Sequence, residues 1–509
     1  MVDLATSRRL HTTRVENTTD GMELWNDDAA LHSKLHKTVG CLSAVAKSIS
    51  TLPDASPPMM QFVQLHQWAQ EVDGEIFERV FRDPRAYHYA RTTFDLYVAK
   101  QSSQPPPQVT REYLEELGGL DFTVALDDHL TQFGKFACAL AYLSGDDLDV
   151  LPVRLLLPDV LPGTGWTISG EASVKLCGVN KQGQLRLAVD GKPCLVALSE
   201  EVTNHEVFRI ELAPEVESIR LSPPTFNLPG LRDIRSVVAS SVAGQGLYTD
   251  VLRDTLGMIE AFAPNTHRQI KQYMRTIAFK PAGAEGVFNT SCSRLPAASI
   301  FTGSRHHLVL ADDLIHEFYH NRLFAIEELG GFFHEDEDFG SVTSFYSPWR
   351  DDPRPAFGVF HAVYVFERVL AFWVAAIDSR QLSGIELDYA SFRAAKLLRQ
   401  LEIAIAQLIA WANLNERGQQ ILKLASDAVL EHREACEQLE IQDRVRAMVL
   451  GDDGNPGHRN NEAGTTVSAT DDLRAHVGEY DVEARCRQIV DHHFEQTAPF
   501  SATIAELLN

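Results

Sequence analysis

The chain has 509 residues, of which 44% are hydrophobic and 23% charged, so it is long enough for two or three packed units and has the composition of a folded protein. Its formal net charge is -24 and its pI is about 5.2. Proteins bind polyanions through clustered Lys and Arg, and the sequence has no such clusters. The acidic net charge therefore argues against nucleic acid and anionic membranes as partners.

The first part of the chain, residues 1–148, is predicted to form a helical domain. Apolar residues recur in it at helical spacing, most clearly over 63–80. Pro84 is expected to begin one helix, and Asp127 and Asp128 are expected to cap another. The aromatic residues of these helices are expected to lie in the core.

Residues 149–230 follow a different pattern, with short runs of period two. Leu185, Leu187 and Val189 form one such run, and Gly183 marks the turn before it. Alternation of this kind is typical of strands that bury one face. A small β-rich subdomain is therefore predicted for this region.

Helical spacing returns in residues 231–509, which are predicted to form a helical domain. One interruption, at 297–310, is predicted to be a strand, a turn at Gly303 and a second strand, forming a short edge sheet. The stretch 451–472 is rich in Gly, Asp and Asn and is expected to be a polar loop. The chain as a whole is thus predicted to be mainly α, of the α+β class.

The cysteines and the beginning of the chain indicate a cytoplasmic protein. The seven cysteines are Cys41, Cys138, Cys177, Cys194, Cys292, Cys436 and Cys486. They form no CxxC pair, which favours reduced thiols over a disulfide framework. The first residues lack the apolar stretch of a signal peptide, and the apolar run at 369–377 is too short to cross a bilayer, so no membrane segment is expected.

The motif that carries chemistry is His316-Glu317-Phe318-Tyr319-His320, an HExxH string. It lies in a helix predicted to begin near Asp312 or Asp313 and to end before Gly330, so the two imidazoles project from one face, one turn apart. Such strings also arise by chance. Here, however, the flanking residues are apolar, and imidazoles buried together need a partner, of which a metal ion is the simplest. Glu317 could take a proton from water or hold a ligand in place.

A third metal ligand has to come from elsewhere, since the Gly and His of the longer metzincin motif are absent after His320. His361 is favoured because it lies among apolar residues on the next strong helix. Glu335 and Glu337 belong to an acidic run that is more often solvated than ligating. Glu367 shares a helix with His361 but is about 240° further round it, so the two cannot both face the metal.

Two arginines lie between these helices in the proline-framed stretch 344–355. Pro348, Pro353 and Pro355 would hold Arg350 or Arg354 in place, which suits recognition of a carboxylate by a guanidinium fork. Ion pairs with the neighbouring aspartates explain the same residues equally well.

The same segments carry a resemblance to a known family. The runs HEFYHNRL, YSPWRDDPRP and GVFHAVYVFERV resemble the HExxH-motif peptide-modification proteins found beside ribosomally made peptide natural products. The N-terminal runs RVFRDPRAYHYARTTFDL and LDDHLTQFGKFACALA and the segment LPGTGW resemble that family as well, so the likeness covers most of the chain.

The resemblance implies an iron(II)- and 2-oxoglutarate-dependent peptide β-hydroxylase that acts with dioxygen on a ribosomally synthesised precursor peptide. It implies that His316, His320 and His361 hold the iron, and that Arg354 or Arg350 binds 2-oxoglutarate. This set departs from the usual two His and one carboxylate of such oxygenases and leaves Glu317 outside the ligand set. A zinc-dependent HExxH metallopeptidase is the alternative, and a non-catalytic peptide-binding scaffold with a structural metal is a third possibility.

Overall fold

The computed structural model of the protein describes residues 27–102, 107–116, 121–170, 172–198, 203–205, 207–222, 245–280, 289–302, 306–334, 344–349, 354–411 and 413–441. Within these residues helices predominate and short strands form small sheets, which confirms the predicted α+β class. The loop predicted at 451–472 lies outside them.

The N-terminal helices are α1 (Asp27–Ile49), α2 (Pro57–Ala69), α3 (Gly74–Phe81), α4 (Pro84–Gln101), α5 (Gln108–Glu116), α6 (Phe122–Thr131) and α7 (Phe133–Ser144). Pro84 begins α4 as predicted, with the side chain of Asp83 accepting from the backbone of Arg85. The prediction that Asp127 and Asp128 are caps is wrong. They lie inside α6, which Asp121 caps by accepting from the backbone N–H of Thr123.

The β-rich region contains two antiparallel sheets. Its strands are β1 (Leu148–Arg154), β2 (Asp159–Val160), β3 (Trp166–Gly170), β4 (Val174–Val179), β5 (Gln184–Val189), β6 (Lys192–Ala197), β7 (Thr203–Asn204) and β8 (Phe208–Leu212). The strand orders are β1-β4-β5-β6 and β2-β3-β8-β7. Asp190 and Gly191 turn between β5 and β6 with φ of 47° and 81°, the left-handed region that a tight hairpin turn requires.

The following part contains a five-stranded sheet and the longer helices. The elements are β9 (Glu215–Val216), β10 (Ile219–Ser222), α9 (Gln245–Phe262), α10 (Pro264–Tyr273), β11 (Thr276–Lys280), β12 (Thr290–Ser291), β13 (Ala298–Thr302), α11 (His307–Glu327), β14 (Ser344–Phe345), β15 (Arg354–Pro355), α12 (Ala356–Asp378), α13 (Gly384–Trp411) and α14 (Glu416–Gln438). In the sheet, ordered β12-β13-β11-β10-β9, the strands β10, β11 and β13 run parallel, and β12 is an antiparallel edge.

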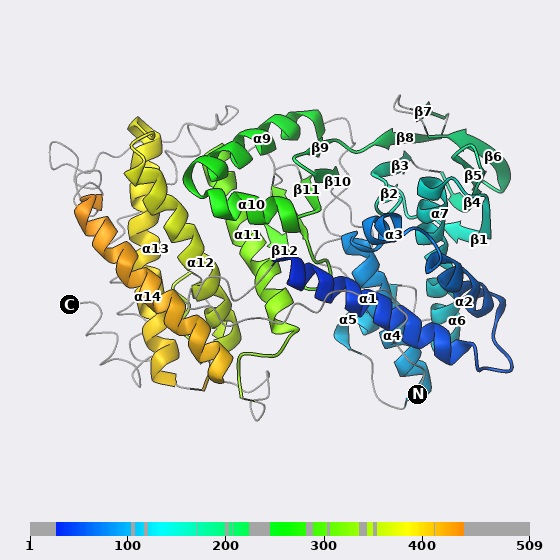
Figure 1. Cartoon of the computed structure of the whole chain (residues 1–509), viewed down its shortest axis with the longest axis horizontal. Helices are drawn as coiled ribbons and strands as arrows, with labels where there is room; N and C mark the ends of the chain where they lie inside the picture. The colour runs from blue at the N-terminus through cyan, green and yellow to red at the C-terminus, as the bar shows by residue number, and fades with distance from the viewer. Residues whose placement is uncertain are drawn as a thin grey trace.

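Two large hydrophobic cores divide the described residues. One runs from Leu42 to Ile210 and is shared by the N-terminal helices and the two antiparallel sheets. The other runs from Val216 to Ile441 and joins the five-stranded sheet to the helices that follow it. Figure 1 shows the first group in blue and cyan beside the second in green to orange.

The second strand predicted within 297–310 is wrong. Ala298–Thr302 forms β13, but Leu308, Val309 and Leu310 are the first turn of α11, and His306 caps that helix by accepting from the backbone N–H of Leu308 at 3.3 Å. The three apolar residues are buried in the second core. An apolar run this short is compatible with either a strand or a buried helical turn.

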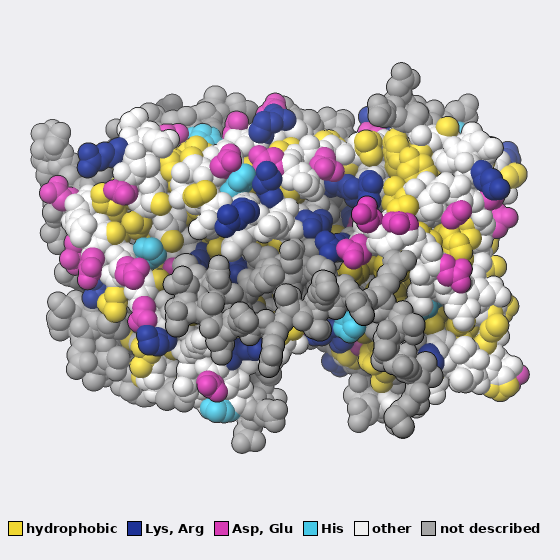
Figure 2. All heavy atoms as spheres, viewed as in Figure 1, with side chains coloured by type: hydrophobic (Ala, Val, Ile, Leu, Met, Phe, Trp, Pro, Cys, Tyr) yellow, Lys and Arg dark blue, Asp and Glu magenta, His cyan; other side chains and the backbone are white. Residues whose placement is uncertain are grey.

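One helix among the described residues, α12, is long and apolar enough to cross a membrane, but 67% of its most apolar stretch is buried within the protein, as expected of a core helix. Charged side chains of both signs are spread over the face shown in Figure 2.

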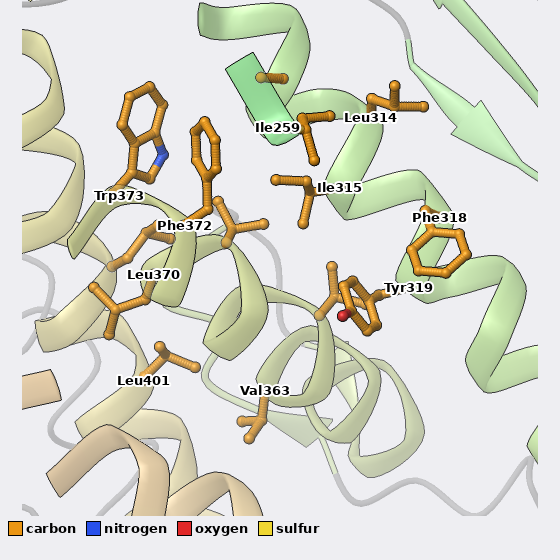
Figure 3. Close-up of a cluster of buried hydrophobic side chains, with 14 of the residues drawn as sticks. Ile259, Leu314, Ile315, Phe318, Tyr319, Val363, Leu370, Phe372, Trp373 and Leu401 are labelled. Carbon is orange, nitrogen blue, oxygen red and sulfur yellow. The ribbon is translucent and has the colours of Figure 1, made fainter. Parts of the chain in front are cut away.

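The helix α11 packs centrally in the second core. Figure 3 shows Ile315 of α11 pointing toward Phe372 of α12, whereas Leu314 and Phe318 lie on the other side of α11. Residues one turn apart on α11 thus face neighbouring elements and fix how the helix is rotated about its axis.

Ionic contacts attach both ends of α11 to other elements. Near its beginning, the buried carboxylate of Asp312 accepts from Arg393 of α13 at 2.6 and 3.1 Å and from Trp373 Nε1 of α12 at 2.8 Å. Just past its end, the carboxylate of Glu328 pairs with Lys34 and with Lys37 of α1, and accepts from Tyr87 of α4 at 2.5 Å. The second contact joins the two cores.

Candidate metal centre

The imidazoles of the HExxH motif meet on α11. The Nε2 atoms of His316 and His320 lie 3.1 Å apart, and their rings are 4.7 Å apart at 73°. Two nitrogens bound at about 2.1 Å to one metal would be separated by about 3.0 Å for a 90° angle and about 3.4 Å for a tetrahedral one. A single N–H···N hydrogen bond between the rings gives the same distance. The pair is therefore spaced as two ligands of one metal would be.

His361 lies near this pair, on α12. Its ring is 5.9 Å from that of His320, its side chain is buried, and its Nε2 has no hydrogen-bond partner among the described residues. A buried ring nitrogen without a partner is costly unless something binds it. Sequence reasoning chose this residue, and the structure brings it to the motif.

Burial keeps the imidazoles of His320 and His361 neutral. It lowers the pKa of His320 to about 4, and burial together with the nearby His320 lowers the pKa of His361 to about 3. A histidine binds a metal through a neutral ring. Both residues are thus in the ligating form across the physiological pH range.

Aromatic rings surround the three histidines. Phe357 lies 3.9 Å and Phe324 5.5 Å from the ring of His361, and Phe366 lies 4.6 Å from that of His316. Trp349 stacks on Phe366 at 5.0 Å and 12°. These rings limit the access of water to the histidines, of which His316 and His320 are half-buried, and this strengthens charged interactions formed there.

Glu317 is buried beside the motif and faces the sheet rather than solvent. Burial raises the pKa of its carboxyl to about 7, while hydrogen bonding with Ser291 of β12 acts in the opposite direction. Asn321 holds the helix to the same sheet by donating to the carbonyl of Ala298 at 3.0 Å. Glu317 thus has a carboxyl that can gain or lose a proton near neutral pH.

The other predicted candidates are placed as follows. Glu367 is buried, but its carboxylate pairs with Arg368 at 3.0 Å and lies 3.4 Å from His432 of α14, so it faces away from the motif as the helical spacing predicted. Arg354 is half-buried in β15, immediately before α12. Glu335, Glu337 and Arg350 lie outside the described residues.

Sequence reasoning missed a second histidine group at the start of α11. Among the described residues, His306, His307 and Glu386 are the group of three whose possible ligand atoms lie within 4.8 Å of one another. The two Nε2 atoms lie 3.7 and 3.8 Å from Glu386. The adjacent pair His306-His307 was a visible signal, but its partner is far away in the sequence on α13.

The capping role of His306 argues against that group as a resident metal site. Its Nδ1 accepts the Leu308 N–H, so its proton sits on Nε2, and that nitrogen can ligate a metal only if the cap is released. His316, His320 and His361 do not reach the 4.8 Å spacing as a trio. Binding one metal through all three therefore requires His361 to move toward the other two.

Comparisons with known proteins give no assignment. Neither the models of protein families nor the curated proteins include a match to this chain.

Proposed function

We propose that the protein is an iron(II)- and 2-oxoglutarate-dependent hydroxylase of a ribosomally synthesised precursor peptide. The observation that carries the metal site is the pair of Nε2 atoms 3.1 Å apart, near the buried His361, whose Nε2 has no hydrogen-bond partner among the described residues. The choice of iron, of 2-oxoglutarate and of a peptide rests on the resemblance of the motif segments to the peptide-modification family.

In this proposal His316, His320 and His361 hold the iron. When bound, iron(II) supplies with 2-oxoglutarate and dioxygen the oxidising power to hydroxylate an unactivated carbon. The protein contributes the position of the metal and limits the access of water, because Phe324 and Phe357 pack against His361. The neutral imidazoles of His320 and His361 bind the cation without first losing a proton.

The arginines would bind the co-substrate. Arg354 precedes the helix that carries His361 and is the first choice for the distal carboxylate of 2-oxoglutarate, with Arg350 the second. Glu317 would not ligate the metal. It would hold α11 to the sheet through Ser291.

A zinc peptidase is the second candidate, and Glu317 supports it. A buried carboxyl beside His316 with a pKa of about 7 suits a base that takes a proton from an attacking water. The edge strand β12 is antiparallel to its neighbour, and an extended peptide can bind such an edge by strand addition.

Metal content tests the site. Purified protein is loaded anaerobically with iron(II), dialysed and analysed for metal. His316→Ala and His320→Ala should each lose at least about 90% of the metal, since removing a ligand costs well over tenfold in affinity. His307→Ala, which alters the second histidine group, is the matched control and should keep it. Loss of metal in His307→Ala alone would move the site to the start of α11.

Product analysis tests the reaction. The loaded enzyme, with its precursor peptide, should form succinate and add one oxygen atom to an intact peptide, and Glu317→Gln should retain part of this activity. Cleavage of the peptide by the zinc-loaded protein without dioxygen, abolished by Glu317→Gln, would instead establish the peptidase.

A further inference from the structure

A charged cleft lies at the junction of the two cores, on elements that the metal centre does not use. It encloses about 310 Å³ between α3, the loop from β2 to β3, and the beginnings of β10 and β11. Four arginines line it: Arg79, Arg82, Arg220 and Arg275. In Figure 2, Lys and Arg side chains gather with Asp and Glu near the middle of the molecule, beside α3 and β10 of Figure 1.

Three acidic residues line the cleft: Glu75 is exposed, and Glu78 and Asp83 bond to neighbouring groups. Glu78 pairs with Arg82 at 2.9 Å. Asp83 pairs with Arg85 at 3.2 Å through one carboxylate oxygen and accepts from the backbone N–H of Gly163 at 3.1 Å through the other. Groups at the wall of the cleft thus engage both carboxylates.

Arg79 and Arg220 keep donors available in the cleft. The Nε of Arg79 donates to the carbonyl of Gly163 at 2.9 Å, a neutral group, and among the described residues no carboxylate lies within ion-pair distance of this guanidinium. Arg220 has its ion pair with Glu215 at 3.6 Å, which is too long for a hydrogen bond. A guanidinium carries five donors, so both side chains retain several.

The surroundings of Arg220 disfavour its charge. Burial lowers its pKa, and the nearby Arg79 and Arg85 act in the same direction, against the attraction of Asp83 and Glu215. A bound anion would offset the cost of holding the charge of Arg220 in this position.

We propose that this cleft binds an organic anion through a carboxylate or phosphate group held between Arg79 and Arg220. The cleft has the size of a small-ligand pocket, so it has room for more than an isolated ion. Guanidinium forks bind both planar carboxylates and tetrahedral phosphates with paired hydrogen bonds. The site is separate from the metal centre, and its test needs no metal.

Calorimetric titration of the full-length protein at low ionic strength, with inorganic phosphate and with citrate as separate probes, tests the proposal. Arg220→Gln, which removes the charge at similar size, should weaken binding at least about tenfold, as expected for loss of a charge-assisted contact. Arg79→Gln, at the exposed rim, should weaken it in the same direction without affecting folding. Arg253→Gln is the control, since Arg253 is exposed on α9 and pairs with Asp250 outside the cleft.

The two probes separate the sources of the anion. Arginine-dependent binding of phosphate but not citrate supports a phosphate ester as the ligand, and the reverse supports a carboxylate. Binding of neither probe by the native protein overturns the proposal. Equal affinity of the native protein, Arg79→Gln and Arg220→Gln overturns it as well, because the anion then binds elsewhere.

Discussion

Replacing Arg393 by Met should destabilise the protein strongly. Arg393 and Trp373 donate three hydrogen bonds to the carboxylate of Asp312, which is 3% exposed. Arg393→Met leaves that carboxylate buried with only the indole as partner, and removing one member of a buried ion pair costs about 3–5 kcal/mol. Asp312 lies one turn before His316, so the variant should also weaken metal binding by rotating α11.

Urea unfolding followed by circular dichroism measures the effect. Adding Asp312→Leu to Arg393→Met removes the stranded charge, and the double variant should recover to within about 1–3 kcal/mol of the native protein, the remainder reflecting the Trp373 N–H left without an acceptor. Arg399→Met, on the same helix, is the control and should cost less than about 1 kcal/mol, because its pair with Glu402 is partly exposed and Arg433 remains. A loss below about 1 kcal/mol in Arg393→Met, or no recovery in the double variant, would refute this reasoning.

Two further predictions concern stability. Burial raises the pKa of Glu327 to about 7, whereas the same carboxyl in the unfolded chain has a pKa of about 4.3. Between these two pH values the folded state holds a proton that the unfolded state has released, so the free energy of unfolding falls as the pH rises. Glu327→Gln should therefore be more stable than the native protein by about 1–2 kcal/mol at about pH 8, after allowance for partial exposure, and equal to it at about pH 4, as pH-dependent urea unfolding would show. Gly163→Ala should cost about 2–4 kcal/mol in the same assay, because φ is 72° and a Cβ would lie 2.7 Å from the carbonyl oxygen of Arg79. Gly145→Ala, with φ of 75° and no atom within 4 Å, should cost about 1 kcal/mol, and equal losses would contradict the steric argument.

The sequence predicted the class of fold and the helices that carry the histidines, because both depend on local periodicity. The sequence-based prediction was wrong where a short apolar run is compatible with two kinds of secondary structure. Leu308, Val309 and Leu310 suit a strand as well as a helical turn, and only the cap at His306 and the packing of the second core decide between them. Asp127 was chosen as a cap because an aspartate precedes apolar residues there, but Asp121 begins the helix six residues earlier.

For the candidate site, too, only features that depend on local spacing could be predicted from the sequence. The spacing of His316 and His320 is local and could be interpreted directly, and His361 was found through its apolar neighbours. The contacts that hold the site are long-range: Asp312 with Arg393 is separated by 81 residues, and no periodicity links the two. The sequence did not identify Ser291 as a hydrogen-bond partner of Glu317, because a serine in a short edge strand is an ordinary residue.

The attachment of Glu328 to α1 and α4 bears on how the protein can be divided for expression. A fragment beginning after the first core would carry α11 with its histidines but would lack Lys34, Lys37 and Tyr87, the three partners that the first core gives to Glu328. It would also lose the packing of α1 against α11. The end of the helix beyond His320 would then fray first. The N-terminal half is accordingly part of the scaffold of the candidate metal centre, although the three histidines themselves lie in the C-terminal half.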